Sequence, residues 1–192
     1  MSSASRTAQR RRARILGRSQ ELLIKFEINQ ADGGRRYRRP YIAVWVEDAE
    51  GFPVRNLAVW VSLGSGLRWL PDMKRVQGRK PPAQGRQGDM VDTIGQATRA
   101  PGAYSLIWDG KDDKGKPVPP GDYTINLEAA REHGTYQFLR KELKLPAGPM
   151  TAELPGNVEI KSASREVRPR QAKGARRPGP RRKGKAGESG GR

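Results

Sequence analysis

Apolar and polar residues alternate with a period of two through much of this chain, most regularly between residues 101 and 134. Such alternation is typical of β-strands that bury one face. The second strand of this stretch carries on its apolar face Tyr123, Ile125, Leu127 and Ala129. Its opposite face, expected in water, carries Thr124, Asn126 and Glu128. The first strand alternates Tyr104, Leu106 and Trp108, and a loop rich in Gly, Pro and Asp follows it. We therefore predict an antiparallel pair of strands joined by this loop.

Further strand patterns lie on both sides of this pair. They cover residues 21–29, 41–48, 56–62, 135–145, 151–154 and 157–162. The positions expected to face inward include Leu22, Ile24, Phe26, Ile28, Tyr136, Phe138, Val158 and Ile160. Residues 41–48 are apolar on both faces, which predicts a central strand covered on both sides, with 56–62 as its partner. Short strands separated by turn signals predict an all-β fold, an antiparallel β-sandwich of about seven to nine strands.

Charge divides the chain into three parts. The 38 Lys and Arg against 20 Asp and Glu give a net charge of +18. Residues 1–19 carry +6 of it and residues 165–192 carry +9, so the central residues 20–164 are nearly balanced at +3. We predict one folded domain over 20–164, with a long loop at 63–90 that is rich in Gly and Pro. The two ends are too poor in apolar residues to fold and are expected to be disordered basic tails.

Composition excludes several classes of chemistry. The chain has no Cys, so it has no disulfide, no thiolate metal site and no Cys nucleophile. It also lacks a phosphate loop, a dinucleotide fingerprint and a Gly-x-Ser-x-Gly elbow, and we expect a protein that is not an enzyme. No apolar run is long enough to span a membrane, and the N-terminal residues lack the apolar segment of a signal peptide.

Three blocks in this order resemble a known bacterial family. They are RRYRRPYIAVWVEDAEGFPVRNLAVWV, WDGKDDKGKPVPPGDYT and LEAAREHGTYQ. The middle block is similar to the hairpin of immunoglobulin-like modules such as that of the flagellar hook-capping protein. Together the blocks resemble the predicted periplasmic family called domain of unknown function 2271. This resemblance implies an immunoglobulin-like sandwich in the bacterial envelope, often beside or fused to membrane proteins of the PepSY type, in gene settings linked to flavin transfer.

A cluster of basic residues before the central strand is the first candidate site. Arginines interleaved with tyrosines can hold a phosphate, a carboxylate or a heme propionate, although a charge run is more often a solvated face. The candidate ligand-binding residues are Arg36, Arg38, Arg39, Tyr41, Arg99, Glu132 and His133. His133 is the only His; with no second His and no Cys, the residues suit zinc poorly, and we expect no metal site. The acidic loop 109–115 departs from the calcium-loop pattern and is expected to be a turn.

The segment from Asp92 to Thr98 suggests a cofactor. It resembles the flavin-attachment motif Asp-x-x-Ser-Gly-Ala-Thr, in which FMN is esterified to the last Thr. Asp92, Ala97 and Thr98 match, but Gly95 and Gln96 replace Ser-Gly. The departure argues against recognition by the transferase, so Thr98 is only a remote candidate as a flavin acceptor, and the alternative is an ordinary strand or loop.

Three roles therefore remain open. The first is a binding or accessory module that partners a membrane-anchored envelope protein, in redox or transport. The second is a cytoplasmic protein whose tails bind nucleic acid without sequence specificity, since basic segments release counterions from any polyanion, anionic lipid included. The third is a redox carrier flavinylated at Thr98. The missing signal segment leaves the location open between envelope and cytoplasm.

Overall fold

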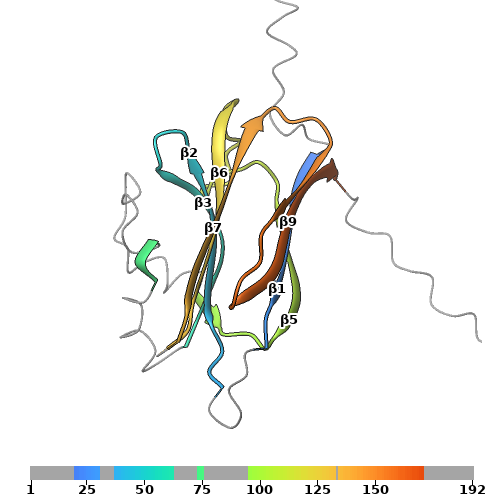
Figure 1. Cartoon of the computed structure of the whole chain (residues 1–192). Coiled ribbons are helices and arrows are strands. Elements are labelled where there is room, and N and C mark those ends of the chain that lie inside the picture. The colour runs from blue at the N-terminus through green and yellow to red at the C-terminus, as the bar shows by residue number, and fades with distance from the viewer. Residues whose placement is uncertain (1–19, 31–36, 63–72, 76–94, 133, 171–192) are drawn as a thin grey trace, which may run out of the picture.

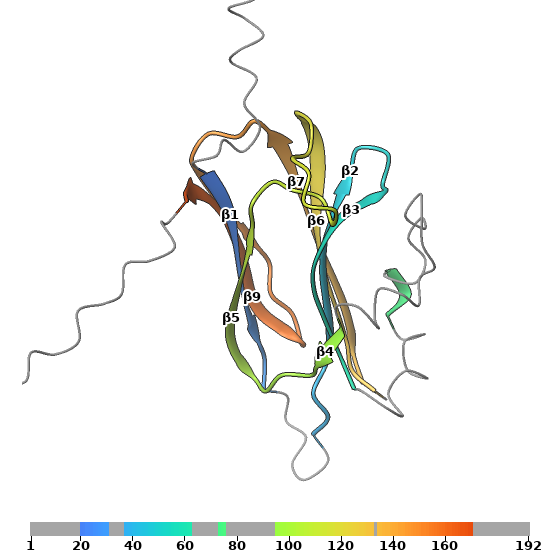
Figure 2. The same cartoon turned by 180° about the vertical axis from the view of Figure 1, so that it is seen from behind.

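The protein is a sandwich of two β-sheets. The computed structural model describes residues 20–30, 37–62, 73–75, 95–132 and 134–170, and these form nine strands in two layers (Figures 1 and 2). The strands are β1 Gln20–Ile28, β2 Tyr41–Asp48, β3 Pro53–Val61, β4 Gly95–Ala97, β5 Gly102–Trp108, β6 Gly121–Ala130, β7 Tyr136–Leu145, β8 Met150–Leu154 and β9 Ile160–Pro169. The all-β sandwich predicted from the sequence is confirmed.

The first sheet has the order β5-β1-β9-β8, and the second has the order β4-β3-β2-β6-β7. Neighbouring strands are antiparallel except for β3 and the three-residue β4, which run parallel. As predicted, β2 is central: Val44 pairs with Ala58 of β3 and with Leu127 of β6. In the first sheet β1 is paired on both sides, and Gln20, where it begins, pairs with Pro169, where β9 ends.

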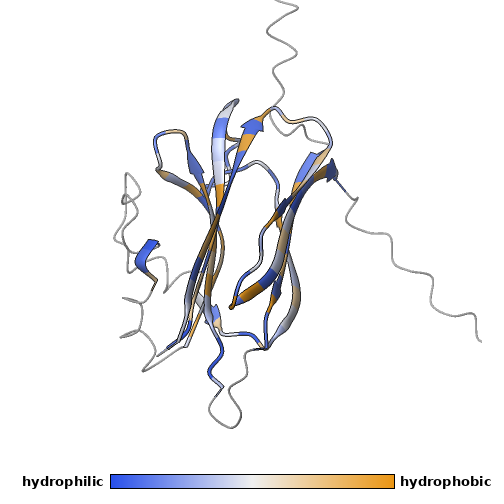
Figure 3. Ribbon diagram, in the orientation of Figure 1, coloured by the Kyte–Doolittle hydropathy of each residue, from blue (hydrophilic) through white to orange (hydrophobic). Residues whose placement is uncertain are grey.

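The core fills the space between the sheets. In Figure 3 hydrophobic residues alternate with hydrophilic ones along the strands of both layers. The predicted inward residues of β1, namely Leu22, Ile24, Phe26 and Ile28, are all buried. Phe26 packs its ring against Trp60 of β3 and Tyr104 of β5, at centroid distances of 5.6 and 6.0 Å. Aromatic contacts of this kind join the two layers and stabilise them beyond simple area burial.

The strands β5 and β6 do not pair, so this part of the prediction is wrong. β5 pairs with β1 in the first sheet, while β6 pairs with β2 and β7 in the second. The connecting segment is therefore an arch between the layers. The Trp108 indole donates to the Lys111 carbonyl (2.8 Å), and the Val118 amide donates to the Gly110 carbonyl (2.9 Å). Two strands that face one core from opposite sides show the same alternation as two paired strands.

Some residues that were predicted to face the core between the sheets do not do so. Tyr136 and Phe138 lie on the outer face of the second sheet, and Leu139 and Leu143 turn to the core instead. The reason is that this outer face is itself covered by apolar side chains, among them Met73. Val158 is exposed because it precedes β9 in a turn.

The folded part extends beyond residue 164. β9 continues through Arg165 to Pro169, and Val167 and Arg165 are both buried. The composition of this segment suggested a disordered tail because Arg is rarely an inward residue. The predictions for residues 1–19, for most of the loop 63–90 and for residues 171–192 fall outside the described residues. Within the described part of the chain, no helix has the length and apolar character needed to cross a membrane.

Candidate functional site

The predicted site residues come together at one end of the sandwich. The strands β1, β3, β6 and β8 end here and β2, β5, β7 and β9 begin here, beside β4 (Figure 2). The predicted residues found here are Arg38, Arg39, Thr98, Arg99 and Glu132. Arg36, His133 and Asp92 fall outside the described residues. Tyr41 begins β2 and is buried in the cluster on the outer face of the second sheet.

Two ion pairs lie at this end, and one of them joins the two sheets. Arg131, after β6, places Nε 3.0 Å from Oε1 of Glu159, which precedes β9 in the other sheet. The Glu159 side chain is fully buried and also accepts a hydrogen bond from the Thr135 hydroxyl. A second pair joins Arg38 to Glu132. Burial, followed by the charge of Glu159, raises the pKa of the Tyr37 hydroxyl. This network fixes the connections that carry the candidate residues.

Two arginines at this end have no carboxylate partner among the described residues. The Arg39 Nη1 donates to the Thr98 carbonyl (3.5 Å), and the Arg99 Nη2 donates to the Gln96 side chain (3.1 Å). The Arg99 guanidinium also lies over the rings of Trp60 and Tyr104, 4.7 and 5.8 Å from their centroids. Both arginines are exposed. We call Arg39 and Arg99 the arginine pair; their adjacent positions suit a phosphate or carboxylate ligand.

A buried acid on the outer face of the second sheet was not predicted from the sequence. Glu128 lies on the outer face of β6, fully buried, and accepts hydrogen bonds from the Tyr136 hydroxyl (2.8 Å) and the Arg75 amide (2.7 Å). Thr124 and Asn126 on the same face are also buried, so the prediction that this face meets water is wrong. The sequence does contain a signal for this burial. Because β2 is apolar on both faces, its outer face must be covered, and this cover extends over the neighbouring strand β6.

The Tyr136–Glu128 contact predicts an alkaline effect on stability. Burial, followed by the hydrogen bond to Glu128, raises the pKa of Tyr136 well above its ordinary value of 10. Above pH 10 the unfolded chain loses this proton while the folded protein keeps it, so stability falls as pH rises. We expect Tyr136→Phe to lose less stability than wild type between pH 10 and 11, measured by urea unfolding. Equal slopes for the two proteins would contradict this. Tyr104→Phe, which removes another tyrosine of the fold, is the control.

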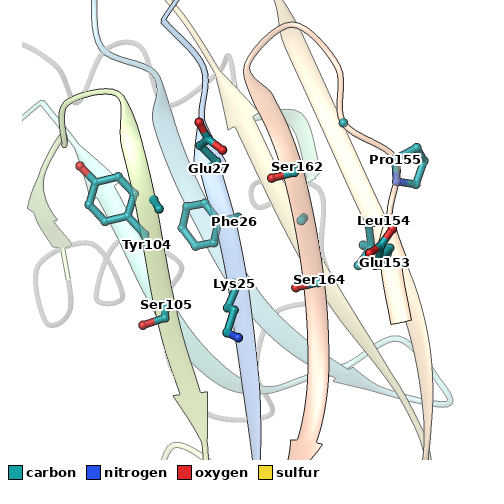
Figure 4. A pocket seen from close by; sticks show the side chains of 13 residues that line it. Lys25, Phe26, Glu27, Tyr104, Ser105, Glu153, Leu154, Pro155, Ser162 and Ser164 are labelled. Atoms are coloured by element: carbon teal, nitrogen blue, oxygen red, sulfur yellow. The ribbon is translucent and has the colours of Figure 1, made fainter. Parts of the chain in front are cut away.

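The outer face of the first sheet is concave. A depression of about 640 Å³ is lined by β5, β1, β9 and the end of β8. Figure 4 shows Ser105, Lys25 and Ser164 side by side on the first three of these strands. Two of its lining charges are paired, because Lys25 contacts Glu166 (3.6 Å) and Glu27 contacts Lys161 (3.0 Å), while Glu153 at the end of β8 also lines it. The small hydroxyl side chains on this face offer hydrogen-bond donors and acceptors.

The described residues show no group of three His, Cys, Asp or Glu side chains placed to hold a metal ion. In the acidic loop the Asp112 carboxylate is used by the chain itself, since its Oδ1 accepts from the amides of Lys114 and Lys116 (2.9 and 2.8 Å). The predicted turn is confirmed. Thr98, the proposed flavin acceptor, follows β4 directly and is partly exposed.

Comparison with known proteins gives one family. Residues 21–162 match the family model described as Predicted periplasmic protein (DUF2271), which covers well over half of the chain. The matched range runs from β1 into β9 and contains the whole end with the arginine pair. No curated protein and no solved structure matches the chain.

Proposed function

This chain belongs to the DUF2271 family of predicted periplasmic proteins, and from that membership we propose a non-enzymatic binding module of the bacterial envelope. Its partner is a membrane-anchored envelope protein of the PepSY type, engaged in redox chemistry or transport. The observation that carries the proposal is the arginine pair, two exposed cations that have no carboxylate partner among the described residues. The partner contributes an acidic or phosphorylated group.

The surroundings of the pair favour binding over simple solvation. Arg99 is stacked on Trp60 and Tyr104, so its guanidinium loses less freedom when it binds an anion. Arg39 is held near it through the Thr98 carbonyl. The ion pair between Arg131 and Glu159 joins the two sheets at the same end of the sandwich. A planar fork of donors on a rigid base is well suited to a carboxylate or phosphate, which it can grip through two hydrogen bonds.

The test is binding of the full chain to membrane vesicles from the native bacterium. The variant Arg39→Ala/Arg99→Ala is expected to bind at least about tenfold more weakly, since hydrogen bonds between charged groups contribute about 1.5–3 kcal/mol each. The matched control is Arg140→Ala/Lys144→Ala, which removes two exposed cations from β7 and the same net charge. The control is expected to bind within about twofold of wild type.

Two results would count against this function. Equal weakening by both variants would mean that only net charge matters. Equal binding to protein-free liposomes of the same lipid composition would identify lipid, not a protein, as the partner.

A second candidate function rests on the charge of the chain ends. Residues 1–19 and 165–192 carry net charges of +6 and +9, which suits a nucleic acid held through counterion release. Fractionation of native cells separates the candidates. Protein recovered from the cytosol on nucleic acid, with affinity falling steeply as salt rises, favours this candidate. Protein recovered with the membrane favours the envelope module.

A third candidate is a redox carrier with FMN on Thr98. The partial exposure of Thr98 beside the arginine pair favours it, because the pair offers donors for a flavin phosphate. Intact mass of the protein from native cells tests it directly. A covalent increment that is absent from Thr98→Ala supports it, and the bare polypeptide mass rejects it.

A further inference from the structure

Arg165 is a buried cation without a counter-charge among the described residues. It lies on β9 between Ala163 and Val167, facing the space between the sheets, and is only 4% exposed. No carboxylate of the described residues lies within ion-pair distance of it, and its Nε has no hydrogen-bond partner there. Burial lowers the pKa of its guanidinium. Buried cations are normally paired, so the Nε of this side chain is left without the strong acceptor that burial normally requires.

Within the described part of the chain, Arg165 donates from Nη1 to the sulfur of Met150 at 3.8 Å. Met150 begins β8, the edge strand of the first sheet, and pairs with Val167, while Arg165 pairs with Ala152. The two side chains are therefore diagonal neighbours on one face. A thioether is a weak acceptor. Met150 is also 43% exposed, which leaves it open to oxidants, whereas Met73 is buried.

We propose that Met150 is an oxidative modification site whose sulfoxide gives the Arg165 guanidinium a stronger acceptor than the thioether. The oxidant is a peroxide. The sulfur lone pair attacks one peroxide oxygen, the O–O bond breaks, and with hydrogen peroxide the second oxygen leaves as water. Sulfur is oxidised by two electrons and the peroxide is reduced by two. The new S=O oxygen accepts a hydrogen bond from the Arg165 guanidinium and fastens the edge strand β8 to β9.

The sign of the effect makes this site unusual among methionines. Oxidation commonly weakens a fold, because it places a polar group among apolar ones. Here the polar oxygen meets a desolvated donor, so oxidation is expected to stabilise the fold. Methionine sulfoxide reductases reverse the modification, which makes the contact a reversible one. The inference is independent of the ligand at the arginine pair.

The test is thermal unfolding of the full chain before and after hydrogen peroxide. Digestion with trypsin releases residues 145–161, which contain Met150 as their only Met, so the modification can be located by mass. Oxidised wild type is expected to unfold at a temperature about 2–4 °C higher. Met150→Leu removes the site and is expected to show no rise. Arg165→Leu keeps Met150 but removes the donor without adding a thioether, and its oxidation is expected to lower the Tm.

A second variant tests the contact without an oxidant. Met150→Gln places an amide oxygen in the same direction and is expected to raise the Tm in wild type, and not in the Arg165→Leu background. The proposal is wrong if oxidised wild type unfolds at the same or a lower temperature. It is also wrong if the rise persists without Arg165, or if Met150 resists peroxide that oxidises free methionine.

Discussion

Glu159→Gln is expected to lower the free energy of unfolding by about 3–5 kcal/mol, because it leaves the Arg131 guanidinium without its charge partner. Glu159 is fully buried, Arg131 is mostly buried, and the two lie 3.0 Å apart. The substitution keeps the size of the side chain, so the loss reports the charge. Urea unfolding measures it, with an unchanged m value as the sign that the folded state keeps its compactness.

The control is an ion pair in water. Lys144 and Asp122 lie 4.0 Å apart, and both side chains are largely exposed. Asp122→Asn is expected to cost less than about 1 kcal/mol. If Glu159→Gln cost no more than this, the buried pair between the sheets would contribute no more stability than an exposed one. The end of the sandwich that carries the arginine pair would then not be stabilised by it.

Trp108→Ala is expected to cost a similar amount, about 3–5 kcal/mol, through the cavity that it leaves. Trp108 ends β5 fully buried, packs its ring 5.8 Å from that of Tyr123 on β6, and donates to the Lys111 carbonyl. It therefore joins the first sheet, the arch and the second sheet.

The milder Trp108→Phe keeps a ring in this place and removes the indole donor. Trp108→Phe is expected to lower the free energy of unfolding less than Trp108→Ala does. The difference between the two reports the volume that the Phe ring fills. Thermal and urea unfolding of both variants give the comparison. Equal losses would mean that the hydrogen bond to the arch, and not the packing between layers, is the main contribution of this residue.

The sequence predicted elements better than their arrangement. The central strand β2 was identified because its two apolar faces can only be satisfied by cover on both sides. The placement of β5 and β6 in different sheets was not predicted, because alternation shows which face of a strand is buried but not which strand lies next to it. Glu128 shows the same limit. Its burial depends on Arg75 and Tyr136, which reach it only through the tertiary fold.

The candidate site divides in the same way. Sequence reasoning selected Arg38, Arg39, Arg99 and Glu132 individually, from charge next to aromatic or strand patterns. Which of them remain without a carboxylate among the described residues follows from the fold, since Arg38 pairs with Glu132 and the arginine pair has no such partner there. Arg165 was assigned to a tail on composition, and its burial comes from the pairing of β9 with β1.

The pairing of Gln20 with Pro169 sets the geometry of attachment. The first residue of β1 and the last residue of β9 are cross-strand neighbours, about 5 Å apart, so the two basic ends of the chain are joined to the sandwich at neighbouring positions. The arginine pair lies at the other end of β1, whose nine residues span about 30 Å. A charged surface that binds both of these basic ends would therefore contact the sandwich where they are joined to it. The arginine pair would then lie about one strand length away from that surface. The sandwich would then act as a spacer, and strand length would set its reach.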